Sequence, residues 1–243
     1  MAKNPDTTPA RRASDRGRYG RLSRERVLAS ALELVDREGL GALSMRRLGA
    51  ELGVEAMALY RYAEGKEALL DGLVEAMHLE LQARLDAEGP ATDDTPDWRA
   101  DLHRFAGTLY DVCLAHPHAV PLLTTRLLAV PMARRPLPVL RSHERVLALL
   151  EKAGLDEAGT AAAFQACLAW LLGYVSVELH PMVDNPDEPD PAFRLGLHRL
   201  PSQELPTLRR TAPALAERGG TKGLAAGLDA LLDRFTDSGP TAP

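Results

Sequence analysis

The sequence predicts an all-α fold. Aromatic residues make up only 5% of the 243 residues, and much of the 45% hydrophobic share is Ala and Leu, which favour helices over strands. Apolar residues recur at helical spacing in segments that end at glycine or proline, and no segment shows the alternation of a half-buried strand. With 26% charged residues, the composition is that of a soluble globular protein of one or two domains.

Capping residues mark the first helices. Residues 1–21 contain few aliphatic side chains and are expected to form a disordered basic arm. A first helix is expected to begin after Ser23, because serine caps helix N-termini, and to end at Gly39. A second, short helix is expected after Ser44, and Gly53, which can take a left-handed conformation at little cost, follows it.

The two short helices around this glycine predict a helix-turn-helix within residues 22–68. The third helix of this domain is expected from about Glu55 to Tyr62. A long helix is expected from near Lys66 to about Glu88, and it would connect the helix-turn-helix domain to the rest of the chain.

The second domain is expected to cover residues 69–240 and to be helical as well. A linker rich in Pro and Asp is expected near residues 90–97, and a long loop with four prolines at residues 183–201. Prolines and glycines bound the helices of this domain, whose expected ranges are about 97–116, 117–130, 136–153, 156–180, 202–218 and 221–236.

The apolar segment 161–177 is too short to predict a membrane span. It covers 17 residues, contains Gln165 and has no basic flank, whereas a span needs roughly 20 apolar residues. A central buried or dimer-interface helix is predicted instead. Because no cationic start followed by an apolar stretch opens the sequence, we expect a cytoplasmic protein with no membrane partner.

Charge is unevenly distributed along the chain. Residues 1–27 carry eight basic and three acidic side chains, whereas residues 71–243 carry sixteen basic and twenty-four acidic ones. A basic end on an acidic protein suggests that this end meets a polyanion, although a solvated tail would show the same charge.

The sequence offers no pattern for a metal, a cofactor or a catalytic centre. Cys113 and Cys167 cannot make a disulfide framework or a four-cysteine zinc site. His116 and His118 flank a proline without further ligands at suitable spacing, and no P-loop, GxGxxG, GxSxG or HExxH sequence is present. We therefore predict no cofactor, no metal and no enzymatic activity.

One long segment resembles a known family. Residues 22–73 read LSRERVLASALELVDREGLGALSMRRLGAELGVEAMALYRYAEGKEALLDGL, and this pattern resembles the DNA-binding domain of the tetracycline-repressor (TetR) family of transcription regulators. The remainder, with Trp98, Leu102, His116-Pro117 and Leu172-Gly173-Tyr174, is similar to the ligand-binding domain of the tetracycline-repressor subgroup. The resemblance implies an all-helical homodimer that binds double-stranded DNA at a palindromic operator and is released by a small organic effector.

The resemblance also implies which residues meet DNA. A major groove admits one α-helix, whose first turn faces the base edges. Ala56, Met57 and Ala58 match the family's base- or backbone-facing positions, and small apolar side chains there suit thymine methyl groups. Tyr60 matches the tyrosine that reaches a phosphate, and Arg46 matches the position that reaches a guanine edge.

Further contacts are expected at helix starts and in the basic arm. Lys66 and Ser44 lie where free backbone N–H groups attract phosphate. Arg47 and Arg61 are either DNA contacts or solvated surface charges, and both interpretations stay open. Arginines separated by glycines can enter a narrow minor groove or attract phosphates without specificity, and the candidates in the arm are Arg16, Arg18 and Arg21.

A ligand pocket is expected between the helices of residues 97–180. Its candidate lining residues are large and apolar or aromatic, although each is also typical of a core: Phe105, Leu109, Leu123, Leu127, Trp170 and Tyr174. Leu123 stands where the family's namesake has a metal-ligating histidine, so we expect a larger apolar or aromatic effector in place of a drug–magnesium chelate. The dimer is expected to form through the helices around 161–180 and 224–235.

Two other function classes remain open. A helical enzyme with an unrecognised site would turn over a small molecule. A DNA-binding architectural protein would bind DNA without an effector, although the large second domain disfavours it.

Overall fold

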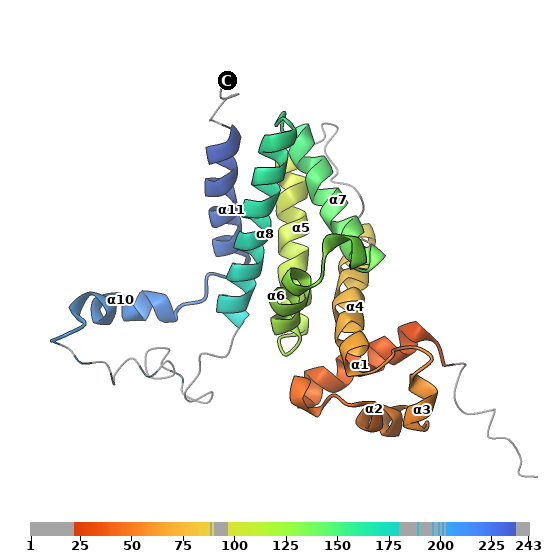
Figure 1. Cartoon of the computed structure of the whole chain (residues 1–243). Helices are drawn as coiled ribbons and strands as arrows, with labels where there is room; N and C mark the ends of the chain where they lie inside the picture. The colour runs from red at the N-terminus through yellow and green to blue at the C-terminus, as the bar shows by residue number, and fades with distance from the viewer. Residues whose placement is uncertain are drawn as a thin grey trace, which may run out of the picture.

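The computed structural model describes residues 22–87, 89, 97–179, 189, 196, 199, 201 and 203–236. Within these residues it contains helices and no strand, which confirms the predicted all-α fold (Figure 1). The basic arm with Arg16, Arg18 and Arg21, most of the linker and most of the expected loop at 183–201 lie outside the described residues.

The first helices begin where the capping residues predict. Helix α1 spans Arg24–Glu38, and the Ser23 hydroxyl accepts a hydrogen bond from the Arg26 N–H. Helix α2 spans Met45–Leu52, and the Ser44 hydroxyl accepts from the Arg47 N–H at 3.1 Å. These bonds satisfy backbone groups that a helix start otherwise leaves without partners.

The turn between α2 and α3 depends on two glycines. Gly53 ends α2 in the left-handed conformation, with φ of 67°. Gly49 lies against the following backbone, since a Cβ atom there would be 2.8 Å from the Val54 carbonyl oxygen. Helix α3 spans Ala56–Leu59 and is shorter than expected, because the Tyr62 N–H bonds the Leu59 carbonyl in a turn in place of a continued helix.

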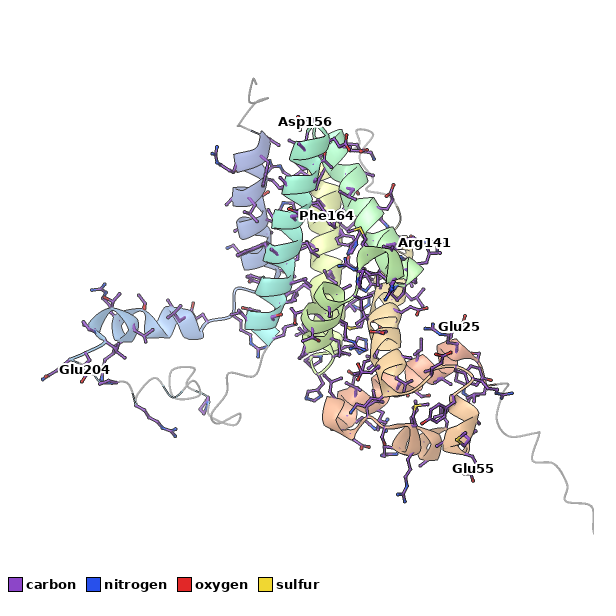
Figure 2. The ribbon with its side chains drawn as sticks, viewed as in Figure 1. Glu25, Glu55, Arg141, Asp156, Phe164 and Glu204 are labelled. Atoms are coloured by element: carbon purple, nitrogen blue, oxygen red, sulfur yellow. The ribbon has the colours of Figure 1, made fainter. Side chains whose placement is uncertain are left out.

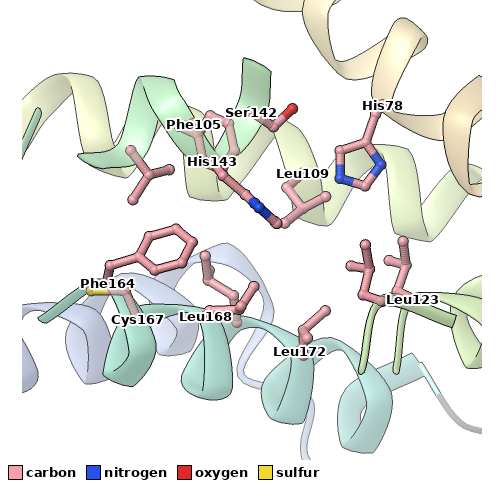
Figure 3. Close-up of a pocket in the computed structure, with 13 residues that line it drawn as sticks. His78, Phe105, Leu109, Leu123, Ser142, His143, Phe164, Cys167, Leu168 and Leu172 are labelled. Carbon is pink, nitrogen blue, oxygen red and sulfur yellow. The ribbon is translucent and has the colours of Figure 1, made fainter. Parts of the chain in front are cut away.

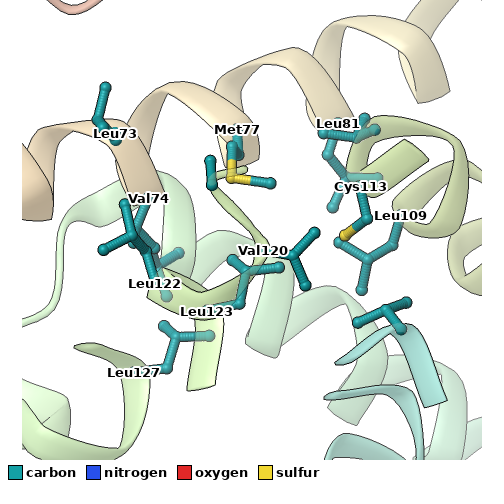
Figure 4. Packing of buried hydrophobic residues seen from close by; sticks show 14 of the residues in the cluster. Leu73, Val74, Met77, Leu81, Leu109, Cys113, Val120, Leu122, Leu123 and Leu127 are labelled. Carbon is teal, nitrogen blue, oxygen red and sulfur yellow. The ribbon is translucent and has the colours of Figure 1, made fainter. Parts of the chain in front are cut away.

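Helix α4, Lys66–Ala87, joins the helix-turn-helix to the other helices. Figure 1 shows α1, α2 and α3 gathered at one end of α4, and α5 (Trp98–Ala115), α6 (Val120–Ala129) and α7 (Leu137–Lys152) pack along the rest of its length. Figure 4 shows Val74 and Met77 of α4 facing Val120 and Leu123 of α6, all of them buried. The two domains therefore share one continuous apolar core through α4.

The second domain is a helical bundle. Its helices agree with the predicted order and are α5 (Trp98–Ala115), α6 (Val120–Ala129), α7 (Leu137–Lys152), α8 (Glu157–Leu179) and α11 (Gly220–Thr236). A further helix, α10 (Pro206–Ala216), extends away from the bundle in Figure 1. Short 3₁₀ turns, η1 (Leu40–Ala42) and η2 (Met132–Arg134), lie between helices.

Helix α8 runs through the middle of the bundle. Of the described helices it alone is long and apolar enough to cross a membrane, judged by length and composition. Its buried side chains, among them Phe164, Leu171 and Val175, pack within the bundle, and its neighbours include α7, α6 and α11. One side of α8 is therefore part of the core of the bundle.

Candidate DNA-binding surface and ligand cavity

The outer surface of the helix-turn-helix carries side chains without an evident role in the core. Met57 is 75% exposed and Tyr60 is 45% exposed, although residues of these types usually bury much of their surface. Ala56 and Ala58 are half-buried beside them on α3. Met57 and Tyr60 thus project from the domain, whereas Ala56 also packs against its core.

The neighbouring arginines of α2 differ in their partners. The Arg47 guanidinium donates to Glu51 at 3.0 Å and to Glu38 at 3.2 Å. Hydrogen bonding from Arg47 lowers the pKa of the Glu38 carboxyl. Arg46 is exposed and has neither an ion pair nor a side-chain hydrogen bond within the described part of the chain. The charge of Arg46 is therefore available to an external anion, whereas that of Arg47 is already paired.

The two tyrosines near α3 also differ. The Tyr62 hydroxyl donates to the Leu22 carbonyl oxygen at 2.8 Å, which ties the start of the domain to the end of the recognition segment. The Arg61 guanidinium lies over the Tyr62 ring, 5.5 Å from its centroid. Tyr60, unlike Tyr62, is exposed at the surface, so its hydroxyl can reach a ligand.

Ser44 and Lys66 border the same surface. Lys66 is the first residue of α4, is exposed, and follows Gly65, whose φ of 123° directs the chain into the helix. The exposed Ser44 hydroxyl accepts a capping bond from Arg47 N–H and keeps its own hydrogen to donate. Both sites combine a helix start with an exposed donor, which is an arrangement that suits phosphate.

Arg126 of α6 connects the second domain to the start of α4. Its guanidinium donates to the Asp71 carboxylate at 2.8 Å, to the Glu67 carboxylate at 2.7 Å and to the Glu67 carbonyl at 2.9 Å. Glu67 immediately follows Lys66. These bonds attach α6 to the N-terminal part of α4.

His116 makes a second connection between the domains. Its Nδ1 lies 2.7 Å from the Asp36 carboxylate of α1, and its Nε2 lies 2.8 Å from the Glu80 carboxylate of α4. Because carboxylates only accept, both bonds form together only when the imidazole carries both protons. Partial burial opposes ionisation of Glu80, but hydrogen bonds from His116 and Arg84 outweigh it and lower the pKa of Glu80.

A narrow cavity lies in the bundle between α4, α5, α6, α7 and α8 (Figure 3). Its volume is about 30 Å³. Four of the six residues predicted to line a pocket lie on its wall, namely Phe105, Leu109, Leu123 and Leu127. Three polar residues that the sequence did not single out line it as well: His78, Ser142 and His143.

The remaining two predicted pocket residues lie elsewhere. The Trp170 indole N–H donates to the Leu224 carbonyl at 3.1 Å, and the Tyr174 hydroxyl donates to the Gly220 carbonyl at 2.7 Å. Both rings thus turn toward α11 and do not line the cavity. The close approach depends on Gly227, where an added Cβ would lie 2.0 Å from the Trp170 ring.

Comparison with known families agrees with this architecture. Residues 27–73 match the family model described as bacterial regulatory proteins, tetR family. Residues 90–234, more than half of the chain, match the model described as tetracyclin repressor-like, C-terminal domain. The chain belongs to the TetR family.

Among similar proteins, an HTH-type transcriptional regulator from Saccharopolyspora erythraea is 36% identical over 157 residues. That match covers 65% of this TetR-family chain and 61% of the relative. The HTH-type transcriptional repressor DrrR1 from Streptomyces coeruleorubidus is 31% identical over 169 residues, which cover 70% of this chain and 58% of that protein. The chain thus matches less than two thirds of the length of these relatives.

A solved structure shows the same fold over a greater length. The transcriptional regulator SCO7222, a TetR from Streptomyces coelicolor, superposes with a TM-score of 0.68 at 25% sequence identity. The match covers 89% of this chain and 99% of that one.

Apart from His78, Ser142 and His143, the residues that line the cavity of this TetR-family protein are apolar or thiol side chains. In the parts of the chain that the structure describes, no group of three or more His, Cys, Asp and Glu is placed to hold a metal ion. Burial raises the pKa of the Cys167 thiol, which lines the cavity, to about 11, and the pKa of the Cys113 thiol to about 12. Both thiols are therefore protonated near neutral pH and act as apolar packing groups.

Proposed function

We propose that this TetR-family protein is a cytoplasmic transcriptional repressor, which binds a palindromic operator as a homodimer and is released by a small organic effector. The observation that carries the proposal is the exposed face of Arg46, Met57 and Tyr60, which is connected through Arg126 to a domain with an apolar cavity. The relative from Streptomyces coeruleorubidus, which is named a repressor, supports the direction of regulation.

In this proposal α3 enters the major groove. Met57 and the flanking Ala56 and Ala58 contact thymine methyl groups or the backbone, while Arg46 reaches a guanine edge. Tyr60, Lys66 and Ser44 bind phosphates and set the position of the helix. The arginines of the basic arm, Arg16, Arg18 and Arg21, add phosphate or minor-groove contacts.

Arg47 and Arg61 have smaller parts in the proposed complex. Arg47 would have to leave two carboxylates to reach DNA, so we assign it to the stability of the helix-turn-helix. Arg61 already lies over the Tyr62 ring, and any phosphate contact would compete with that packing.

The proposed dimer forms through α8 and α11. One side of α8 is buried in the bundle, yet the other carries small or apolar exposed residues at helical spacing, including Ala162, Ala169 and Gly173. Val177, on the same side, is 65% exposed. Two such faces would bury each other in a symmetric pair. Ala169→Arg should therefore convert the dimer to monomers in light scattering, whereas the same change at exposed Ala133 in the η2 turn should not.

The small size of the cavity suggests how an effector would release the protein from DNA. Drug-sized ligands occupy pockets of about 300–1,000 Å³, whereas this cavity measures about 30 Å³. A drug-sized effector can therefore enter this cavity only if one of its walls is displaced. Helix α6 provides Leu123 and Leu127 to the wall and holds α4 through Arg126, so its displacement would tilt α4 and change the separation of the two recognition helices.

The decisive experiment is fluorescence anisotropy with DNA fragments from the regions that flank the gene, at fixed salt and with excess competitor DNA. Arg46→Ala should weaken binding to the best fragment by about 1–3 kcal/mol. Lys66→Ala should lower the salt dependence by about one phosphate contact. Arg141→Ala is the matched control, since Arg141 is exposed on α7, far from Glu55 at the start of α3 (Figure 2).

Other outcomes would favour the alternative functions. Specific binding that no small molecule releases would support an architectural DNA-binding protein. Turnover of a small molecule by the purified protein would support an enzyme. Equally weak binding to every fragment, with no difference between Arg46→Ala and Arg141→Ala, would refute the proposed DNA-binding surface.

A further inference from the structure

The walls of the cavity are free of charge. Leucine and phenylalanine side chains predominate, and no Lys, Arg, Asp or Glu is among the described residues that line it. A charged ligand would lose its hydration there without an opposite charge to replace it, which is strongly unfavourable. The apolar lining therefore favours an uncharged ligand.

His78 presents a hydrogen-bond acceptor to this apolar space. Its Nδ1 lies 2.9 Å from the Val74 carbonyl oxygen, and because a carbonyl only accepts, Nδ1 carries the proton. Burial lowers the pKa of His78, against a smaller opposite effect of the Val74 bond, so the ring is neutral near pH 7. The lone pair of Nε2 then has no donor within the described residues.

His143 presents a second polar group without a partner. The residue is only 7% exposed, and its Nδ1 is buried without a hydrogen bond to any described residue. Its ring meets the Phe164 ring edge-on, with 5.3 Å between centroids, and this contact gives Nδ1 no hydrogen-bond partner. Burial, with the nearby charge of Arg135 and the proximity of His78, lowers the pKa of His143 to about 4. Such unpaired buried groups are rare because they cost free energy.

The other cavity residues determine what can approach these imidazoles. The Ser142 hydroxyl donates to the Pro138 carbonyl at 3.1 Å and is committed to its own helix. Phe105 and Phe164 provide aromatic walls from α5 and α8, against which a flat ring can pack. Figure 3 shows the imidazole rings of His78 and His143 directed into the space between the helices.

We propose that the effector is an uncharged aromatic molecule with a hydroxyl group, and that His78 and His143 recognise this hydroxyl by hydrogen bonds. A hydroxyl donates one hydrogen and accepts others, so it can serve the Nε2 acceptor of His78 and the unpartnered Nδ1 of His143 together. This inference rests on the proposed function, since it specifies the ligand class of the same cavity. His78 and His143 are then specificity-determining residues, because an analogue without the hydroxyl leaves the buried Nδ1 of His143 unpaired and gives Nε2 of His78 no donor.

The test is isothermal titration calorimetry of the full-length protein with three probes near pH 7: 2-naphthol, naphthalene and 2-methoxynaphthalene. The wild type should bind 2-naphthol roughly tenfold more tightly than either analogue, as expected for one or two neutral hydrogen bonds. His143→Phe and His78→Leu should each reduce this preference severalfold and leave naphthalene binding nearly unchanged. Leu168→Met, a change of similar volume on the same wall, should retain the preference.

The outcomes separate the ligand class from the regulatory function. Equal affinity of the wild type for the three probes, or failure to bind any of them, would overturn the inference without the use of a variant. A preference that persists in both histidine variants would overturn it as well, and would indicate that buried water satisfies the imidazoles. Operator binding is measured separately without a probe: its absence alongside a clear hydroxyl preference would refute the repressor and leave the ligand class standing.

Discussion

The unpartnered His143 makes the stability of the fold depend on pH. Its pKa is lowered from 6.5 to about 4 in the folded protein. When the pH falls below the pKa of the unfolded chain, the unfolded chain binds a proton at His143 that the folded protein does not bind. The stabilisation is therefore fully present above pH 6.5 and is lost as the pH falls from 6.5 to about 4. At 1.36 kcal/mol per pKa unit, the full loss is about 3 kcal/mol, of which about 2 kcal/mol has occurred by about pH 5.

The comparison is between the wild type and His143→Leu, which cannot bind this proton. Urea unfolding at one protomer concentration, near pH 7.5 and near pH 5, gives the free energy of unfolding of each protein. The wild type should lose about 2 kcal/mol more than the variant over this interval. His78 shifts in the same direction but is present in both proteins, so its contribution largely cancels. An identical loss in both proteins would show that His143 is hydrated or paired in the folded state and would refute the reasoning.

Three further substitutions test the connections between helices. Gly49→Ala places a Cβ 2.8 Å from a backbone oxygen of the α2–α3 turn, so it should lower both the midpoint of unfolding and operator affinity, the latter by roughly tenfold. Gly227→Ala meets the Trp170 ring at 2.0 Å and should cost about 1–3 kcal/mol in urea unfolding without changing the Kd of surviving dimers for the operator. His116→Ala leaves the Asp36 and Glu80 carboxylates without their shared donor and should cost about 2 kcal/mol in the same assay. An unchanged unfolding midpoint in any of these variants would contradict the packing or bonding assigned to that residue.

The helix starts of the first domain follow from neighbouring residues alone. A capping serine acts on an N–H three positions along the chain, as Ser23 does on Arg26 and Ser44 on Arg47. Gly53 likewise ends α2 through its own backbone conformation. Such interactions are local, so the order and starting points of these helices were predictable without knowledge of the fold. The early end of α3 was not predicted: after Leu59 the chain forms a turn, in which the Tyr62 N–H bonds the Leu59 carbonyl.

Side-chain partners across the fold were beyond sequence reasoning. The sequence predicted six pocket residues from their size and their apolar or aromatic character. Of these, Leu123 and Leu127 lie on the cavity wall, whereas Trp170 and Tyr174 face α11. Helical periodicity shows that a face is buried and is silent about which neighbour covers it.

The hydrogen bonds between distant residues show most clearly what the sequence could not predict. Arg126 meets Asp71 across 55 positions of the chain, and His116 meets Asp36 across 80. No motif or spacing links residues so far apart, because loop closure and packing of whole helices bring them together. Short-range bonding and the apolar pattern therefore specify the helices, and the resemblance of residues 22–73 indicates the family of this chain. Its cavity, its unpaired histidines and its link between domains arise only when those helices pack.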